Sequence, residues 1–220
     1  MNTFEEFRGD SPNDAPVHGF LHRSPGTTND WLILTHGAGS NCHAPLLVAL
    51  ADSFYASGWT VLRCDLPFRQ RRPHGPPPRG SAEQDQQGLA AAVACARRQT
   101  SGRVLLGGHS YGGRQASMLA ADKPGLVEAL LLLSYPLHPP QKPGELRTAH
   151  FPHLQTPALF VSGARDGFGS IDELTSALTL IPARTELLSV PGAGHELLGK
   201  KNRDALMETV VTTFRQFEEA

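Results

Sequence analysis

The sequence has 220 residues, of which 40% are hydrophobic, and its formal net charge is -1. This length and composition predict one domain with a full hydrophobic core. A charge so close to neutral argues against nucleic acid or an anionic membrane as the main partner. No run approaches the roughly 18 apolar residues of a membrane-spanning helix.

The N-terminus and the cysteines suggest where the protein works. The chain starts with a polar, acidic stretch instead of the apolar core of a secretory signal. Its three cysteines, Cys42, Cys64 and Cys95, are scattered, which predicts neither a disulfide framework nor a zinc site. We therefore expect a cytoplasmic protein that needs no metal and no organic cofactor.

Short apolar runs alternate with amphipathic stretches along the chain. Residues 1–16 are expected to be a loose lead-in to a single domain over residues 17–220. The pattern predicts strands at residues 17–22 (an edge strand), 31–35, 59–64, 103–107, 127–133, 158–161 and 185–190. It predicts helices at residues 44–57, 81–98, 110–121, 171–180 and 204–217, with a capping box formed by Ser81 and Gln84.

This alternation predicts the fold class. Strands that alternate with helices build a mostly parallel sheet with helices on both faces, a three-layer α/β/α sandwich. Ligands bind such sheets outside the carboxyl ends of the strands. The polar clusters that follow the predicted strands are therefore the candidates for a functional site.

The first such cluster contains a candidate nucleophile. Gly108-His109-Ser110-Tyr111-Gly112 matches the G-x-S-x-G pattern. The pattern is short, so its position between a predicted strand and a predicted helix is what indicates a nucleophile elbow. Side chains in place of the two glycines would collide with the neighbouring strand and helix, which explains why glycine stands there.

Two further candidates follow later strands. Asp166 comes after the strand at residues 158–161, and His195 comes after the strand at residues 185–190. A serine hydroxyl needs a base, so His195 would take the proton of Ser110 while Asp166 orients the imidazole. Asp172 is the alternative acid, and either aspartate could instead serve a turn or a helix start.

Other reactive residue types nearby have simpler interpretations. His36, before a glycine-rich loop, is expected to brace that loop, and His109 is expected to be structural. Nothing near Cys42 in the sequence marks its thiol as activated.

With these residues in hand, the chain resembles the alpha/beta hydrolases over nearly its whole length. Ser110, Asp166 and His195 stand in the family's triad order. The closer likeness is to small dienelactone-hydrolase-like proteins, and it rests on residues 34–40, 61–68 with 71–73, and 107–114. This group also resembles the hydrolase-like domain in a subunit of the chromatin non-specific-lethal complex. Dienelactone hydrolases use a cysteine nucleophile, from which Ser110 departs.

The resemblance implies an oxyanion hole and an activity. One donor would be the backbone N–H of Tyr111, and the other would be Ala38, with Gly37 or Gly39 as alternatives. The expected function is a serine hydrolase that cleaves small-molecule carboxylic esters through an acyl-enzyme. A peptidase, thioesterase or acyltransferase could use the same triad. The alternative from another class is a non-catalytic binding or scaffold protein.

Two segments bear on the substrate. The family usually inserts a cap before the strand that precedes the acid, but residues 137–155 are too short and too rich in proline for a helical lid. We therefore expect no substantial cap and an open site for small or short-chain esters. Residues 67–80 hold four arginines and no acid. They predict either a solvated, stiff loop or a positive rim on which Arg71 and Arg72 receive an anionic substrate. Gly37 and Gly39, from the loop after the strand at residues 31–35, are also expected to line the substrate site.

Overall fold

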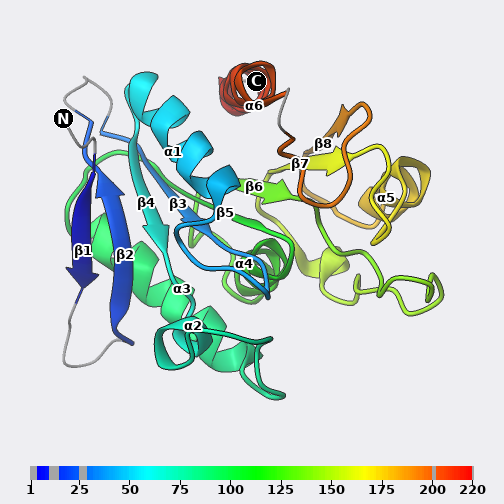
Figure 1. Ribbon diagram of the computed structural model, residues 1–220, viewed down its shortest axis with the longest axis horizontal. Helices are drawn as coiled ribbons and strands as arrows, with labels where there is room; N and C mark the ends of the chain where they lie inside the picture. Colours follow the sequence, from blue (N-terminus) through cyan, green and yellow to red (C-terminus); the bar gives the residue numbers. More distant parts are fainter. Residues whose placement is uncertain (1–3, 10–14, 25–28, 200–201, 220) are drawn as a thin grey trace.

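The computed structural model describes residues 4–9, 15–24, 29–199 and 202–219. Within these residues eight strands form one sheet in the order β1-β2-β4-β3-β5-β6-β7-β8 (Figure 1). Neighbours from β4 to β8 are parallel, whereas β1 and β2 run antiparallel to their neighbours. The strands are β1 (Glu5–Gly9), β2 (Val17–His22), β3 (Trp31–Thr35), β4 (Thr60–Cys64), β5 (Val104–His109), β6 (Leu130–Leu133), β7 (Ala158–Gly163) and β8 (Thr185–Val190).

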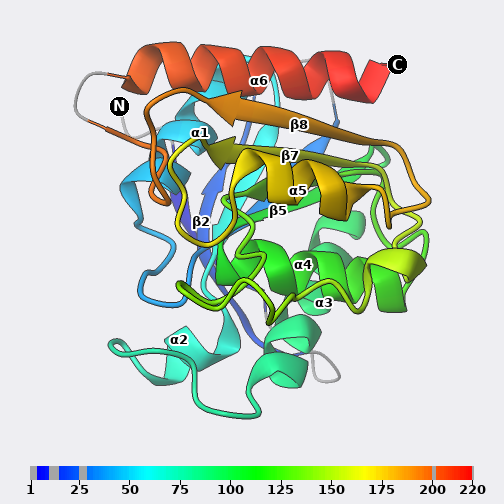
Figure 2. The same ribbon diagram turned by 90° about the vertical axis from the view of Figure 1, so that its right-hand side faces the viewer.

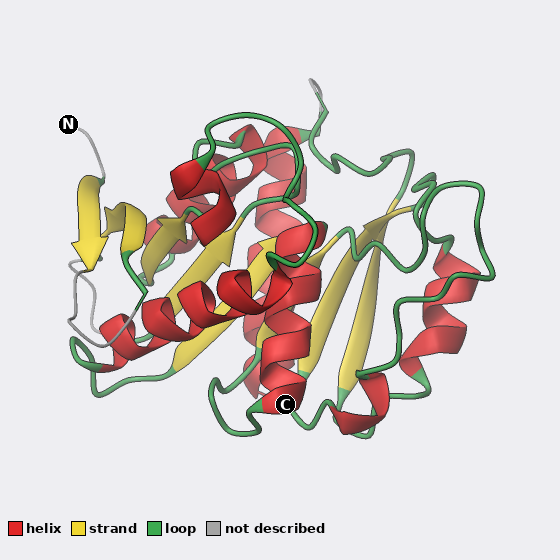
Figure 3. Ribbon diagram, turned by 90° about the horizontal axis from the view of Figure 1, so that it is seen from below, coloured by secondary structure: helices red, strands yellow, loops and turns green. Residues whose placement is uncertain are grey.

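Helices cover both faces of this sheet, so the predicted three-layer architecture is confirmed. Figure 2 shows α6 on one side and α3 and α4 on the other, and Figure 3 shows helices lying across the strands. The helices are α1 (Pro45–Ala56), α2 (Pro67–Arg71), α3 (Ala82–Arg97), α4 (Tyr111–Asp122), α5 (Ile171–Leu178) and α6 (Arg203–Glu219), with one short 3₁₀ turn at Phe151–His153.

The central strands are buried on both faces, which explains their continuous apolar sequences. All five residues of β3 are buried. Because side chains alternate along a strand, Leu32 and Leu34 pack with α1 and α6 while Ile33 packs with α3 and α4. The sheet is thereby held rigidly between two hydrophobic layers, and its carboxyl edge is a fixed platform.

The expected loose lead-in is wrong for residues 5–9, which form β1 against β2. Phe7 is the β1 residue that packs on the core, so this edge strand lacks the alternation that marks a strand in the sequence. As a result β2 is the second strand of the sheet and not its edge. Residues 1–3 and 10–14 of the expected lead-in lie outside the described residues.

The predicted capping box at Ser81 is also wrong. Ser81 has helical dihedrals and makes no side-chain cap. Its hydroxyl donates to Asp85 Oδ2 at 3.1 Å, and because Ser81 lacks the extended dihedrals of an N-cap, its oxygen accepts no N–H of the first turn. A capping box is present at α5, where Ser170 and Glu173 cap each other. The other predicted elements are confirmed, with ends that shift by up to three residues.

No cap domain interrupts the sheet. Residues 137–155 contain only the 3₁₀ turn, as their prolines and glycines predict. None of the helices in the described part of the chain is long and apolar enough to cross a bilayer. The carboxyl edge of the sheet is bordered by the loops that follow its strands and by the start of α1.

Candidate active site

Ser110 lies on the tight turn between β5 and α4. Its dihedrals are φ 51 and ψ -115, a region that residues with side chains rarely adopt. The turn is crowded, because a Cβ on Gly108 would lie 2.7 Å from the carbonyl carbon of Gly112. A Cβ on Gly112 would lie 2.5 Å from the carbonyl oxygen of His36. The turn thus has the elbow geometry that the sequence predicts, and glycine is sterically required on both sides of the serine.

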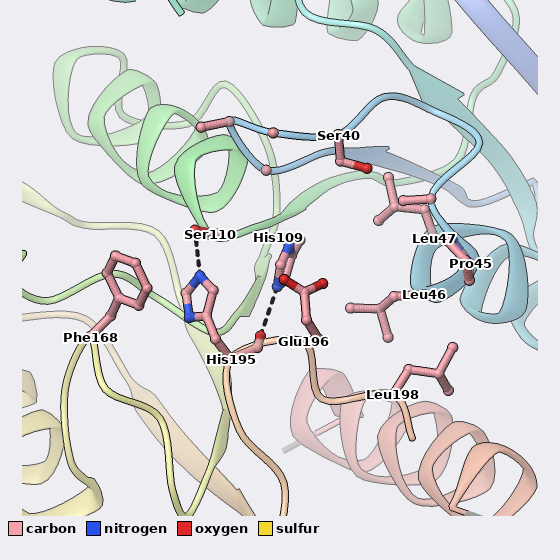
Figure 4. Close-up of a pocket in the computed structure, with 14 residues that line it drawn as sticks. Ser40, Pro45, Leu46, Leu47, His109, Ser110, Phe168, His195, Glu196 and Leu198 are labelled. Carbon is pink, nitrogen blue, oxygen red and sulfur yellow. Dashed lines mark hydrogen bonds between the residues drawn. The ribbon is translucent and has the colours of Figure 1, made fainter. Parts of the chain in front are cut away.

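The structure brings Ser110, His195 and Asp166 together in one hydrogen-bonded chain. His195 Nε2 lies 2.8 Å from Ser110 Oγ (Figure 4). His195 Nδ1 lies 3.0 and 2.8 Å from the two carboxylate oxygens of the buried Asp166. A carboxylate only accepts, so Nδ1 carries the proton and the Nε2 lone pair faces the serine hydroxyl. Asp172 lies in the first turn of α5 and makes no described contact with this imidazole.

Two neighbours hold the imidazole of His195 in place. The ring of Phe168 stacks on it, with centroids 4.1 Å apart. His109 Nε2 lies 2.9 Å from the His195 carbonyl oxygen, so it donates a proton there. Burial holds the pKa of His109 below its usual range, which keeps this ring neutral. The expected structural role of His109 fits this contact. Phe168 was not among the residues expected at the site, and its position two residues after Asp166 is the sequence signal that could have found it.

A tight turn over residues 37–40 lies beside the serine. The N–H of Ser40 donates to the carbonyl of Gly37 at 3.1 Å. His36 Nε2 accepts the N–H of Leu66 at 3.1 Å, so Nδ1 carries the proton and donates to the same Gly37 carbonyl at 2.8 Å. Burial lowers the pKa of His36 and favours this neutral form. His36 therefore braces the loop, as the sequence predicts.

The candidate oxyanion donors border the same space. Gly37, Ala38 and Gly39 line the cavity in front of Ser110. A Cβ on Gly37 would lie 3.5 Å from the Cβ of Ser110, so this turn directly adjoins Ser110. Tyr111 is the first residue of α4, and an N–H in that position has no partner inside the helix.

The cavity has a volume of about 620 Å³ and mostly apolar walls. Among its described lining residues, Glu196 is the one side chain of fixed charge. Figure 4 shows Leu46, Leu47 and Leu198 facing Ser110 across this space. The apolar lining residues are Ala44, Pro45, Leu46, Leu47, Phe168 and Leu198.

The arginines expected at a positive rim do not line this cavity in the described structure. Arg71 donates to Gln84 Oε1 at 2.7 Å, and Arg72 is exposed outside the cavity. The segment that was expected to be a loop starts with α2. Arg71 and Arg72 therefore fit the solvated alternative rather than the positive rim, and the wall of the cavity is mostly apolar.

Other reactive groups offer no alternative chemistry. Cys42 is fully buried, and burial raises the pKa of its thiol, so the thiolate is disfavoured. Among the described residues no group of three or more histidine, cysteine or acidic side chains could hold a metal ion.

Comparison with known proteins places this geometry in context. Residues 28–218 match the family model described as an alpha/beta hydrolase domain. A dienelactone hydrolase from Anabaena variabilis has a TM-score of 0.75 and 21% identity, covering 98% of this chain and 99% of that chain. A lid-less serine hydrolase from Xanthomonas campestris gives 0.77 and 17%, covering 99% and 96%. Est1E from Butyrivibrio proteoclasticus, with ferulic acid bound, gives 0.78 and 16%, covering 97% and 100%. At such identities these structures establish a shared fold.

Proposed function

The chain belongs to the alpha/beta hydrolase domain family, and from this we propose that it is a small, cap-less serine hydrolase that cleaves carboxylic esters. The observation that carries the proposal is the 2.8 Å contact between Ser110 Oγ and His195 Nε2, backed by the two contacts from Nδ1 to Asp166. A binding or scaffold protein has no need to keep a strained serine in line with a base and an acid.

In the proposed reaction, Ser110 Oγ attacks the ester carbonyl carbon while His195 Nε2 takes the hydroxyl proton. The tetrahedral intermediate collapses to an acyl-serine, and the same proton leaves with the alcohol. A water molecule then attacks the acyl group with His195 as base, which releases the acid and restores the serine. Asp166 stabilises the imidazolium that forms in each half-reaction.

The carbonyl oxygen becomes negative in both tetrahedral intermediates and needs fixed donors. We assign the N–H groups of Ala38 and Tyr111 to this role, because they come from the two segments that adjoin Ser110. Such donors act strongly because they are already oriented before the charge develops.

The cavity supports a substrate of limited size and without negative charge. Its walls are apolar, and no cap extends them into a long tunnel. The carboxylate of Glu196 borders the space where an anionic substrate group would lie. Neutral esters with a short acyl group therefore fit the site better than the anionic esters expected from the arginine-rich segment.

A fluorophosphonate probe tests the proposal, because it labels only an activated serine. Labelling of the wild type is expected, together with loss of labelling in Ser110→Ala and full labelling in the matched control Ser176→Ala. A folded wild type that stays unlabelled would favour the scaffold alternative. Acetyl ester, thioester and anilide substrates compared on untreated wild-type enzyme then separate an esterase from a thioesterase or peptidase.

A further inference from the structure

One buried arginine supports the turn over residues 37–40 from the side away from the cavity. Arg69 belongs to α2 and is only 5% exposed. Its Nε donates to the carbonyl of Ser40 at 2.6 Å, and one terminal nitrogen donates to the carbonyl of Ala38 at 2.9 Å. The same guanidinium also donates to the carbonyls of Gly75 and Arg72, at 2.9 and 3.0 Å. One side chain thus joins the oxyanion turn to the segment that follows α2.

Arg69 is unusual because, among the described residues, peptide carbonyls and the face of the Phe68 ring, whose centroid is 4.9 Å from the guanidinium carbon, take the place of a carboxylate. In the described structure no carboxylate lies within ion-pair distance of it; all four of its hydrogen bonds go to backbone oxygens. Burying a cation without a counter-ion is unfavourable unless its donors are satisfied, and the planar fork of arginine can satisfy several at once. A purely apolar contact would have filled this space at a lower energetic cost.

The geometry of the peptide unit links these bonds to the oxyanion donors. A peptide is planar and trans, so fixing its carbonyl also fixes the N–H of the next residue in the opposite direction. His36 and Ser40 fix the Gly37 carbonyl and hence the N–H of Ala38. Arg69 fixes the Ala38 carbonyl and hence the N–H of Gly39. The N–H groups of Ala38 and Gly39 therefore point away from the side chains of His36 and Arg69, which hold the carbonyls of Gly37 and Ala38.

Helix α2 itself is tied to the other half of the site. Asp85 is fully buried in α3, and its Oδ1 accepts the N–H of Phe68 at 3.0 Å. Its Oδ2 accepts the hydroxyl of Tyr111 at 2.8 Å. The residue after the nucleophile and the turn at residues 37–40 thus share one support, which runs from Asp85 through α2 to Arg69.

We propose that Arg69 is a positioning residue that holds the turn over residues 37–40 in the conformation that receives the developing oxyanion. It does not touch the substrate. Its guanidinium prevents the turn from relaxing, and its positive charge lies behind the amides that face the oxygen. The inference rests on the proposed function, since a turn without an oxyanion to bind would gain nothing from this support.

The test compares Arg69→Lys and Arg69→Ala with the matched control Arg72→Met, an exposed arginine of the same segment. Three quantities are measured: kcat, KM for p-nitrophenyl acetate, and the inhibition constant of a trifluoromethyl ketone, which forms an oxyanion on Ser110. In Arg69→Ala we expect kcat to fall about 10- to 100-fold, while KM stays within about twofold of the wild-type value. This loss of kcat should be smaller than the roughly 100- to 1000-fold loss caused by removing a direct oxyanion donor, because Arg69 acts through the turn. The inhibition constant should rise by the same factor as kcat/KM falls.

Rescue separates positioning from general stabilisation. Millimolar guanidinium chloride should restore part of kcat in Arg69→Ala and leave Arg72→Met unchanged. Arg69→Lys keeps the charge without the fork and should fall between the wild type and Arg69→Ala. An unchanged inhibition constant of the ketone in folded Arg69→Ala would overturn the proposal. It would also be overturned if both Arg69 variants failed to fold while Arg72→Met folded normally. Failure of the proposed function is distinct, because the wild type itself would then bind no fluorophosphonate.

Discussion

The phenyl ring of Phe168 lies stacked on the imidazole of His195, with ring centroids 4.1 Å apart and planes 30° apart. This contact covers one face of the base, and Phe168 also donates its own N–H to Asp166 at 2.9 Å. One residue therefore orients both the base and the acid. An aromatic face also stabilises a cation by about 0.5–2 kcal/mol, so it favours the imidazolium that forms during the proposed reaction.

Removing this ring should slow the reaction. We expect Phe168→Ala to lower kcat/KM for p-nitrophenyl acetate by about tenfold, since roughly 1.4 kcal/mol of imidazolium stabilisation corresponds to that factor. Phe168→Leu keeps apolar cover without an aromatic face and is the control. Equal activity of the wild type and Phe168→Ala in steady-state assays would rule out a role for the stacking.

The choice of acid is tested by two matched substitutions. Asp166→Asn removes the negative charge and replaces one carboxylate oxygen by an NH2 donor, which no longer fixes the Nδ1-protonated tautomer of His195, and we expect kcat to fall by about a thousandfold or more. Asp172→Asn changes an exposed helix-start residue and should stay within about twofold of the wild type. Circular dichroism of both variants controls for folding. A large loss in the Asp172 variant instead would reassign the acid.

The charge of Glu196 predicts a substrate preference. Glu196→Lys should raise kcat/KM for an aryl ester with an acyl carboxylate about fivefold relative to its neutral analogue. The lysine attracts the substrate carboxylate, whereas Glu196 repels it. The effect should shrink at 0.5 M salt, since the side chain is exposed. Arg71→Met with Arg72→Met is the control. If that pair shifts the ratio and Glu196→Lys does not, the positive-rim interpretation is right after all.

The buried His22 predicts loss of stability in acid. Arg63 Nε donates to His22 Nε2 at 3.0 Å, so that nitrogen must be unprotonated. Burial lowers the pKa of His22 to about 4. The unfolded chain binds a proton near pH 6.5 and the native chain does not, so stability is full above that value and falls between pH 6.5 and 4.

Urea unfolding at pH 7.5 and pH 5 measures this effect. We expect the wild type to lose on the order of 1 kcal/mol of unfolding free energy from this one group, allowing for solvent screening. His22→Gln keeps an acceptor for Arg63 and should lose less, whereas His43→Gln at an exposed position should behave as the wild type. Identical pH dependence in all three proteins would refute the assignment.

Local patterns in the sequence predicted much of the fold and the residues that lie in one hydrogen-bonded chain, Ser110, His195 and Asp166. Parallel strands buried on both faces appear as apolar runs, and the elbow requires glycines at fixed positions, so Ser110 and the loops of Asp166 and His195 could be located. The edge strand β1 could not, because its pairing with β2 depends on hydrogen bonds and few buried side chains.

The arginine-rich segment shows where prediction from local sequence patterns fails. Residues 67–80 look like a run of positive charge, and nothing in that run distinguishes Arg69, which is buried, from Arg71 and Arg72, which face outward. The difference arises from the carbonyls of residues 38–40, about thirty positions earlier in the chain. Similarly, Ser81 and Ser170 both begin a capping-box pattern, but only Ser170 has the extended backbone of an N-cap, whereas the helical Ser81 donates its hydroxyl to Asp85.

The left-handed backbone of Ser110 lowers the stability of the folded chain at the residue whose hydroxyl the proposed reaction needs. Glycine adopts such dihedrals without steric cost, so the chain would be more stable with no hydroxyl there. A Ser110→Gly protein should therefore melt at a higher temperature than the wild type while losing its labelling by fluorophosphonate. The strained backbone at Ser110 therefore carries a cost in stability that only the hydroxyl of the proposed reaction offsets.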